Sequence, residues 1–264
     1  MKNTLKILII TLITFGVYFI LDETYFKTVR TWFFELTNQF GVSHIITYAL
    51  SGIPILIGTV FISRGTSPFE SLGLNKSLKT GLIVSIICTL PLLIGNSLVF
   101  DSNPKLSINT LLVTVIAAGF FEELFFRAFL FGQLFKHTRL GFIPSVFLGA
   151  LFFGLIHLYQ SDELTEIIIV FLVTFVGGIL FAWVYAEWNY NLWVPIFIHM
   201  LMNLSWELFE VSDTAIGGMY SNIFRVISLG LVITVTLVYK RRKKMRLAIT
   251  KSTIWLKKKS LLTN

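Results

Sequence analysis

Three charged residues stand inside an otherwise apolar stretch of the chain, GFFEELFFRAFLFG, at Glu122, Glu123 and Arg127. Carboxylates can take protons as general bases, and an arginine can neutralise a carboxylate or a developing negative charge. Each charged residue at the centre of a membrane helix costs about 2.5–3.5 kcal/mol on insertion scales. Such residues face a bundle interior or a wet cavity, so we expect these three to mark a functional site.

Helical spacing gives the two glutamates different roles. Glu123 and Arg127 are four residues apart and share a helix face, so they are predicted ion-pair partners. Glu122 is rotated by about 100° from Glu123, which leaves it without a partner in its own helix and makes it the candidate proton acceptor. The alternative is an ion-pair network between helices that only stabilises the bundle.

Two further apolar stretches carry polar residues at helical spacing. FFGLIHL places Phe153 four residues before His157, and VPIFIHMLMNLSW places His199 and Asn203 on one helix face. A lone buried histidine is more often a hydrogen-bonded core residue than a catalyst. Two histidines on separate helices, with an amide and Glu122, supply a general base, proton-transferring imidazoles and an oxyanion-stabilising amide.

The depth of His157 leaves an alternative open. With a helical rise of 1.5 Å per residue, His157 falls about 10 Å nearer the outer surface than Glu122. Either this helix enters the membrane at Pro144 or beyond, or His157 lies outside the site.

The other histidines, Glu207 and the single cysteine are expected to take no part in the chemistry. His44 begins an apolar segment, and His137 lies in a loop beside basic residues. Glu207 lies near the outer end of its helix and needs no buried partner. The single cysteine, Cys88, lies in an apolar stretch, where a packing role is expected and no intrachain disulfide can form.

The elements that position these residues are predicted to be membrane helices. The chain has 264 residues, of which 55% are apolar and 14% charged, whereas soluble domains carry about 25% charged residues. A helix needs about 20 apolar residues to cross a bilayer. We therefore predict an all-α, polytopic bundle with a single transmembrane domain over 1–239, a catalytic core over about 108–210, and an interfacial helix over Asp22–Phe40. Eight crossings are expected, at about 5–21, 42–63, 79–100, 108–134, 142–160, 164–186, 191–209 and 222–239.

Basic residues predict the orientation of the chain. Ten of the 22 Lys and Arg lie between Lys240 and Lys259, directly after an apolar run. Because it follows an apolar run, the basic tail, 240–264, indicates a cytoplasmic anchor to anionic lipid headgroups rather than a nucleic-acid site. With both termini in the cytoplasm, the outer segments hold only Lys27, Arg30 and Lys105, so the positive-inside rule favours this orientation.

The three motifs resemble those of one protein family. EELFFR at 122–127 matches EExxxR, FGLIH at 153–157 matches FxxxH, and HMLMN at 199–203 matches HxxxN. These are the motifs of the type II CAAX prenyl endopeptidase family, also called the CPBP or Abi family. The SLGL at Ser71–Leu74 is similar to a segment of bacterial members. The resemblance covers roughly 108–210 and implies a protein of the bacterial cell membrane.

The resemblance implies an intramembrane endopeptidase and gives each residue a role. Glu122 would activate the attacking water, with His157 helping to hold or deprotonate it. His199 and Asn203 would stabilise the tetrahedral oxyanion. The adjoining Glu–Arg pair matches the family's supporting residues.

Metal use is left open by the residues. Glu122, His157 and His199 could form a His₂Glu zinc set, and the family is often labelled a metalloprotease. The chain has no HExxH, however, and a base with an oxyanion site needs no metal. The resemblance favours no cofactor, with a divalent metal such as zinc as the alternative.

The resemblance implies a peptide or protein substrate at the membrane. A prenylated CAAX tail, a pheromone precursor, a bacteriocin leader and a membrane-protein segment all fit. One alternative is a non-catalytic membrane partner in bacteriocin immunity or signalling. Another is a proton-coupled transporter, since intramembrane Glu, His and Arg also mark ion paths.

Overall fold

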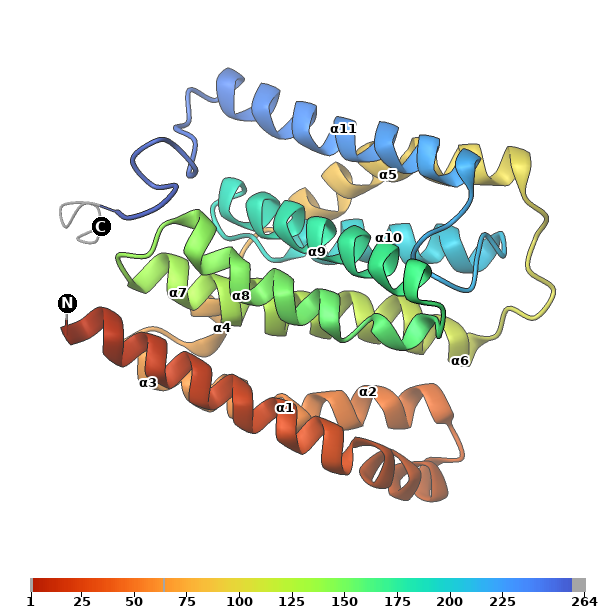
Figure 1. The fold of residues 1–264 in the computed structure, drawn as a ribbon, viewed down its shortest axis with the longest axis horizontal. Helices are drawn as coiled ribbons and strands as arrows, with labels where there is room; N and C mark the ends of the chain where they lie inside the picture. The colour runs from red at the N-terminus through yellow and green to blue at the C-terminus, as the bar shows by residue number, and fades with distance from the viewer. Residues whose placement is uncertain (1, 64, 258–264) are drawn as a thin grey trace.

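The computed structural model describes residues 2–63 and 65–257, and these residues form a bundle of helices (Figure 1). Most of the predicted apolar segments become one helix each, and the second becomes two. The helices are α1 (Lys2–Thr37), α2 (Phe40–Ser51), α3 (Ile53–Ile62), α4 (Pro68–Leu72), α5 (Leu78–Val99), α6 (Ile108–Thr110), η1 (Leu111–Phe131), α7 (Gly132–His137), α8 (Phe142–Leu155), η2 (Leu158–Gln160), α9 (Leu164–Glu187), α10 (Trp193–Leu208) and α11 (Met219–Arg242).

The chain is a multi-pass membrane protein, as predicted. Seven helical segments are long and apolar enough to cross a bilayer, and they correspond to seven of the eight predicted crossings. The eighth predicted crossing, 191–209, forms α10, which has 16 residues. Its length is about 24 Å, shorter than the roughly 30 Å of a bilayer's hydrocarbon core.

The two ends of the described chain meet at one end of the bundle (Figure 1). The N–H of Arg139 donates to Thr4 Oγ1 at 3.3 Å, and the carbonyl of Arg139 accepts the N–H of Lys257 at 2.8 Å. A chain that starts and ends on one side crosses an even number of times. We therefore predict that the short α10 is the eighth crossing. That this side faces the cytoplasm stays a prediction.

The predicted interfacial helix over Asp22–Phe40 does not form as a separate element. α1 instead continues without a break from Lys2 to Thr37. No Gly or Pro occurs between Asp22 and Thr37, so nothing interrupts the helical hydrogen bonds. The helix ends before Asn38, which adopts a left-handed conformation with φ 52°.

The helix that carries the charged motif lies in the middle of the bundle. α1, α2 and α3 lie on one side of it, and α5 and α11 on the other, with α8, α9 and α10 around it (Figure 1). η1 is wound more widely than an α-helix, and the N–H of Gly132 reaches back five residues to the carbonyl of Arg127. Every residue from Glu123 to Phe135 is buried. The charged motif therefore faces protein rather than lipid.

The second predicted segment is broken in its middle. Pro54 lies in the first turn of α3 and cannot donate a backbone hydrogen bond, so α2 ends at Ser51. After α4, Gly73 has φ 83°, and a Cβ there would lie 1.9 Å from the carbonyl oxygen of Tyr190. This close approach fixes the SLGL segment against the loop between α9 and α10.

The basic tail is only partly solvated. Lys240 continues α11 and is 2% exposed, because it pairs with the buried Glu187. Lys257 is also buried, at 7% exposure. Six basic side chains of this segment are exposed, namely Arg241, Arg242, Lys243, Lys244, Arg246 and Lys251. Lys258 and Lys259 lie outside the described residues.

Candidate active site

A buried carboxylate joins two of the predicted site helices. Arg127 Nη1 lies 3.2 Å from Glu123 Oε1, the contact that the i,i+4 spacing predicts. His199 Nδ1, on α10, lies 2.8 Å from the same oxygen. Because a carboxylate only accepts hydrogen bonds, Nδ1 carries the proton and Nε2 is left for other partners. Glu123 therefore orients the imidazole as well as pairing with the guanidinium.

Glu122 faces the other nitrogen of the same imidazole. Its Oε2 lies 3.9 Å from His199 Nε2, which is too long for a hydrogen bond. This oxygen is buried and has no hydrogen-bond partner among the residues that the structure describes. The Glu122 side chain is 14% exposed, whereas that of Glu123 is 0% exposed. Glu122 Oε2 thus lies beside His199 Nε2 without a hydrogen bond to it.

The ring of Phe153 connects α8 to this cluster. The guanidinium carbon of Arg127 lies 3.8 Å from the ring centroid, a close cation–π contact. The ring centroids of His157 and His199 lie 4.5 and 6.4 Å from it. Phe153 therefore packs against both imidazoles and the buried cation at once.

His157 lies just beyond the end of α8, which stops at Leu155. Its Nδ1 is 2.6 Å from the carbonyl oxygen of Phe153. α8 begins at Phe142, two residues before Pro144, and entry into the membrane at Pro144 or beyond stays a prediction. The depth estimate assumed helices along the membrane normal, whereas membrane helices tilt by about 20° on average.

Asn203 lies one turn beyond His199 on α10 and is half-buried. Its Nδ2 donates to the carbonyl oxygen of Thr114 on η1 at 2.8 Å. An asparagine amide carries a second N–H, so one donor remains for another acceptor. Within the described residues, Asn203 makes no hydrogen bond to the other candidate side chains.

The candidate metal ligands do not form a metal site in this structure. In the part of the chain described here, no group of three or more His, Cys, Asp or Glu side chains is placed to hold a metal ion. The donor set of Glu122, His157 and His199 therefore does not fit a metal here.

Residues 104–205 match the family described as type II CAAX prenyl endopeptidase Rce1-like. This segment is 102 of the 264 residues long. It contains all six candidate residues of the three motifs. The chain is also similar to a Bacillus subtilis (strain 168) protein named "Putative membrane peptidase YdiL", with 28% identity over 170 residues. The similarity covers 63% of this chain and 56% of that protein, so the chain spans little more than half of its relative's length. No solved structure matches the chain significantly.

Two features of this site could not be predicted from the sequence. The contact between Glu123 and His199 joins separate helices, so spacing along one helix could not reveal it. Phe181 on α9 lies outside the three motifs, yet its ring centroid is 5.7 Å from that of His199 and 5.4 Å from the Arg127 guanidinium. Both depend on how helices distant in sequence pack together.

Proposed function

We propose that the chain is an intramembrane endopeptidase in which Glu122 activates a water molecule. The observation that carries this proposal is the gap between Glu122 Oε2 and His199 Nε2. Both atoms can accept a hydrogen bond from water, and Glu123 holds the imidazole in place from its far side. The match of residues 104–205 to an endopeptidase family and the similarity to a protein named as a membrane peptidase support this proposal.

The reaction would proceed through a tetrahedral intermediate. The water oxygen bonds to the peptide carbonyl carbon while Glu122 takes one of its protons. The carbonyl oxygen becomes an oxyanion, which the free N–H of Asn203 would stabilise, together with His199 once its Nε2 has taken up a proton from bulk water. The C–N bond then breaks as Glu122 returns the proton to the leaving amine. His157 would hold the water or carry protons.

The substrate in this proposal is a peptide or protein segment held at the membrane. The site helices lie in a membrane domain, so a substrate must reach the site from the bilayer or its surface. Exposed basic side chains after α11 would keep this face of the domain at anionic headgroups.

Peptide termini in intact cells provide the test. Newly formed N- and C-termini of membrane and secreted peptides would be compared between cells with wild-type protein, Glu122→Gln and Glu35→Gln. Glu35 is an exposed glutamate near the end of α1, so its replacement serves as the matched control. We expect a set of termini to be present with wild type and Glu35→Gln and lost with Glu122→Gln, at equal protein abundance.

The same comparison can reject the proposal. An unchanged set of termini in Glu122→Gln cells would exclude Glu122 as the base. If the variant also kept a bacteriocin-immunity phenotype, the non-catalytic alternative would replace the peptidase.

A further inference from the structure

The last described segment of the chain, Ala248–Lys257, runs back over the start of α8, and we call it the C-terminal strap. Three successive strap carbonyls accept hydrogen bonds from the first residues of that helix. The N–H of Gly141 donates to Trp255 at 2.7 Å, that of Phe142 to Thr253 at 2.8 Å, and that of Ile143 to Ile254 at 2.9 Å.

These bonds satisfy N–H groups that the α8 sequence itself leaves without a capping side chain. The first four N–H groups of a helix have no partner within it and are usually satisfied by a capping side chain or by water. The N-cap residue of α8 is Gly141, which has no side chain to cap with. The fourth position is Pro144, which has no N–H. The strap therefore satisfies every backbone donor at the start of α8.

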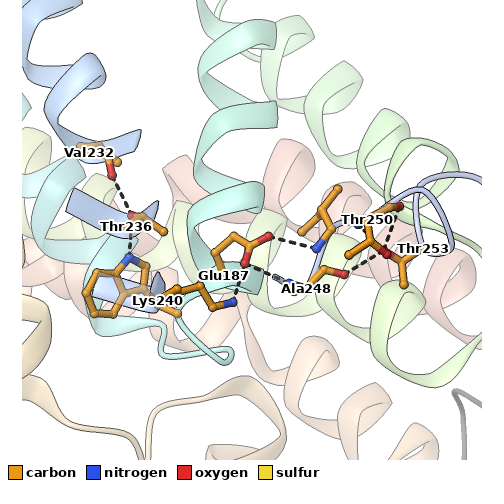
Figure 2. Close-up of polar contacts among 9 residues, drawn as sticks. Glu187, Val232, Thr236, Lys240, Ala248, Thr250 and Thr253 are labelled. Atoms are coloured by element: carbon orange, nitrogen blue, oxygen red, sulfur yellow. Dashed lines mark hydrogen bonds and ion pairs between the residues drawn. The ribbon is translucent and has the colours of Figure 1, made fainter. Parts of the chain in front are cut away.

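The beginning of the strap is held by a buried glutamate at the end of α9 (Figure 2). Glu187 Oε2 lies 2.5 Å from Lys240 Nζ and accepts the N–H of Ala248 at 3.0 Å, while Oε1 accepts the N–H of Ile249 at 3.0 Å. The side chains of Glu187 and Lys240 are 0% and 2% exposed. One carboxylate thus binds both the end of α11 and the start of the strap.

The far end of the strap is fastened separately. Leu256 pairs with Leu140 as an isolated antiparallel bridge. The N–H of Lys257 donates to the carbonyl of Arg139 at 2.8 Å, and its Nζ donates to the carbonyl of Phe135. The strap is therefore fixed on both sides of the contacts that cap α8.

We propose that Glu187 is a positioning residue, which holds the strap against α8 and so sets where Phe153 and His157 lie. Phe153 is 11 residues along α8 from Phe142, about 17 Å from the capped end. A helix transmits a shift at one end to the other because its hydrogen bonds make it stiff. This inference rests on the proposed peptidase function for its effect on rate, but its structural part can be measured without any substrate.

Hydrogen exchange of the purified full-length protein tests the structural part. In Glu187→Ala, we expect exchange to rise at least tenfold at the amides of Gly141, Phe142 and Ile143. We also expect faster exchange at the amides of Ile156 and His157, which lie at the site end of α8. Amides of α5, which packs against α10 and α11, serve as the internal control.

Cleavage kinetics test the effect on rate. With a cleaved peptide found by the comparison of termini, Glu187→Ala should lower kcat at least tenfold and change KM less than threefold. Lys240→Arg keeps a cation beside Glu187 and should retain kcat within about threefold. A chain that ends at Leu247 keeps the Glu187–Lys240 pair but lacks the strap, and it should behave as Glu187→Ala does, even if the latter fails to accumulate.

A disulfide can replace the Glu187 contacts that hold the strap. Directly paired residues of antiparallel strands have Cα atoms about 4.5–5.5 Å apart, within the range that a disulfide spans. Leu140→Cys with Leu256→Cys, in a Cys88→Ser background, should restore slow exchange and kcat to Glu187→Ala on oxidation and lose both on reduction. The same cysteines in the wild type should change neither.

Each result decides the proposal. Unchanged amide exchange at Gly141–Ile143 in Glu187→Ala would overturn the proposal. A rise in exchange confined to that end of α8 would also overturn it. So would an unchanged kcat in a variant whose exchange is faster at both ends of α8. If the wild type cleaves nothing, the peptidase proposal fails, and exchange at His157 still decides whether the strap positions α8.

Discussion

At the scale of single residues, the site depends on how one carboxylate is shared. Glu123 Oε1 contacts both Arg127 and His199, so it balances a buried cation and orients an imidazole at the same time. Both glutamates have a buried Oε2 without a hydrogen-bond partner among the described residues, but Glu122, the preceding residue, has no cation or imidazole within hydrogen-bond distance. Two adjacent glutamates of identical chemistry thus have different surroundings, because their neighbours on other helices differ.

Arg127→Met should destabilise the protein strongly. It leaves Glu123 buried without its cation, and breaking a buried pair from one side costs roughly 3–5 kcal/mol. In the double variant Glu123→Gln with Arg127→Met, the loss should be clearly smaller than the sum of the two single losses. Thermal unfolding in detergent measures these differences. Strictly additive losses would show that the two side chains are not coupled.

Phe153→Leu should reduce activity more than stability. Leucine keeps most of the apolar volume but removes the ring that contacts Arg127 and both imidazoles. We expect a stability loss of about 1–2 kcal/mol and at least a tenfold fall in kcat. Phe147→Leu, at a half-exposed position of the same helix, is the control and should keep kcat. Equal effects of the two variants would contradict a role for the Phe153 ring.

At the scale of elements, the sequence predicted helices well and their breaks poorly. The predicted crossings 164–186 and 222–239 match α9 and α11 within a few residues, because apolar runs and the charges that end them are local signals. The continuous α1 and the wide turns of η1 were not predicted, since both depend on backbone hydrogen bonding rather than composition. The strap was not predicted either, because its partners lie about a hundred residues away.

The candidate site also contains some contacts that the sequence predicted and others that it did not. The pairing of Glu123 with Arg127 follows from spacing along one helix. The contacts of His199 with both glutamates required the relative placement of η1 and α10, which no periodicity encodes. The catalytic roles of Glu122, His157, His199 and Asn203 stay predictions.

Two glycines with the same backbone conformation should tolerate alanine differently. Gly73 and Gly65 both have positive φ, at 83° and 91°, but an added Cβ meets the Tyr190 carbonyl only at Gly73. We expect Gly65→Ala to cost about 1–2 kcal/mol, from backbone strain alone. Gly73→Ala should cost at least about 2 kcal/mol more, because the α9–α10 loop must move. Equal thermal shifts would show that this contact does not constrain the fold.

At the scale of the whole molecule, the shared contacts of Arg139 place both ends of the described chain on one side. Reporter domains fused to either terminus should therefore respond to the same compartment, and the basic residues after α11 predict that this is the cytoplasm. Fluorescent and phosphatase reporters measure this directly. Reporters active on opposite sides would mean that α10 does not cross the membrane.

Burial lowers the pKa of Lys257 to about 8, well below the roughly 10.4 of a solvated lysine. Between pH 8 and pH 10, the unfolded chain therefore binds more protons than the folded chain, so the folded state gains stability as pH rises. Lys257→Met lacks this titration. The melting temperature of the wild type should thus rise relative to that of Lys257→Met from pH 7 to pH 9.5. A constant difference would place the Lys257 amine in solvent.

The shortness of α10 has a consequence for the path of water. A helix of about 24 Å that crosses a hydrocarbon layer of about 30 Å leaves non-helical backbone within the layer, where such backbone is tolerated only against protein or a water-filled cavity. No residue from Trp193 to Leu208 is exposed on the surface of the bundle, so α10 meets protein rather than lipid. We therefore expect water to reach the level of His199 from the ends of α10 and not through the lipid.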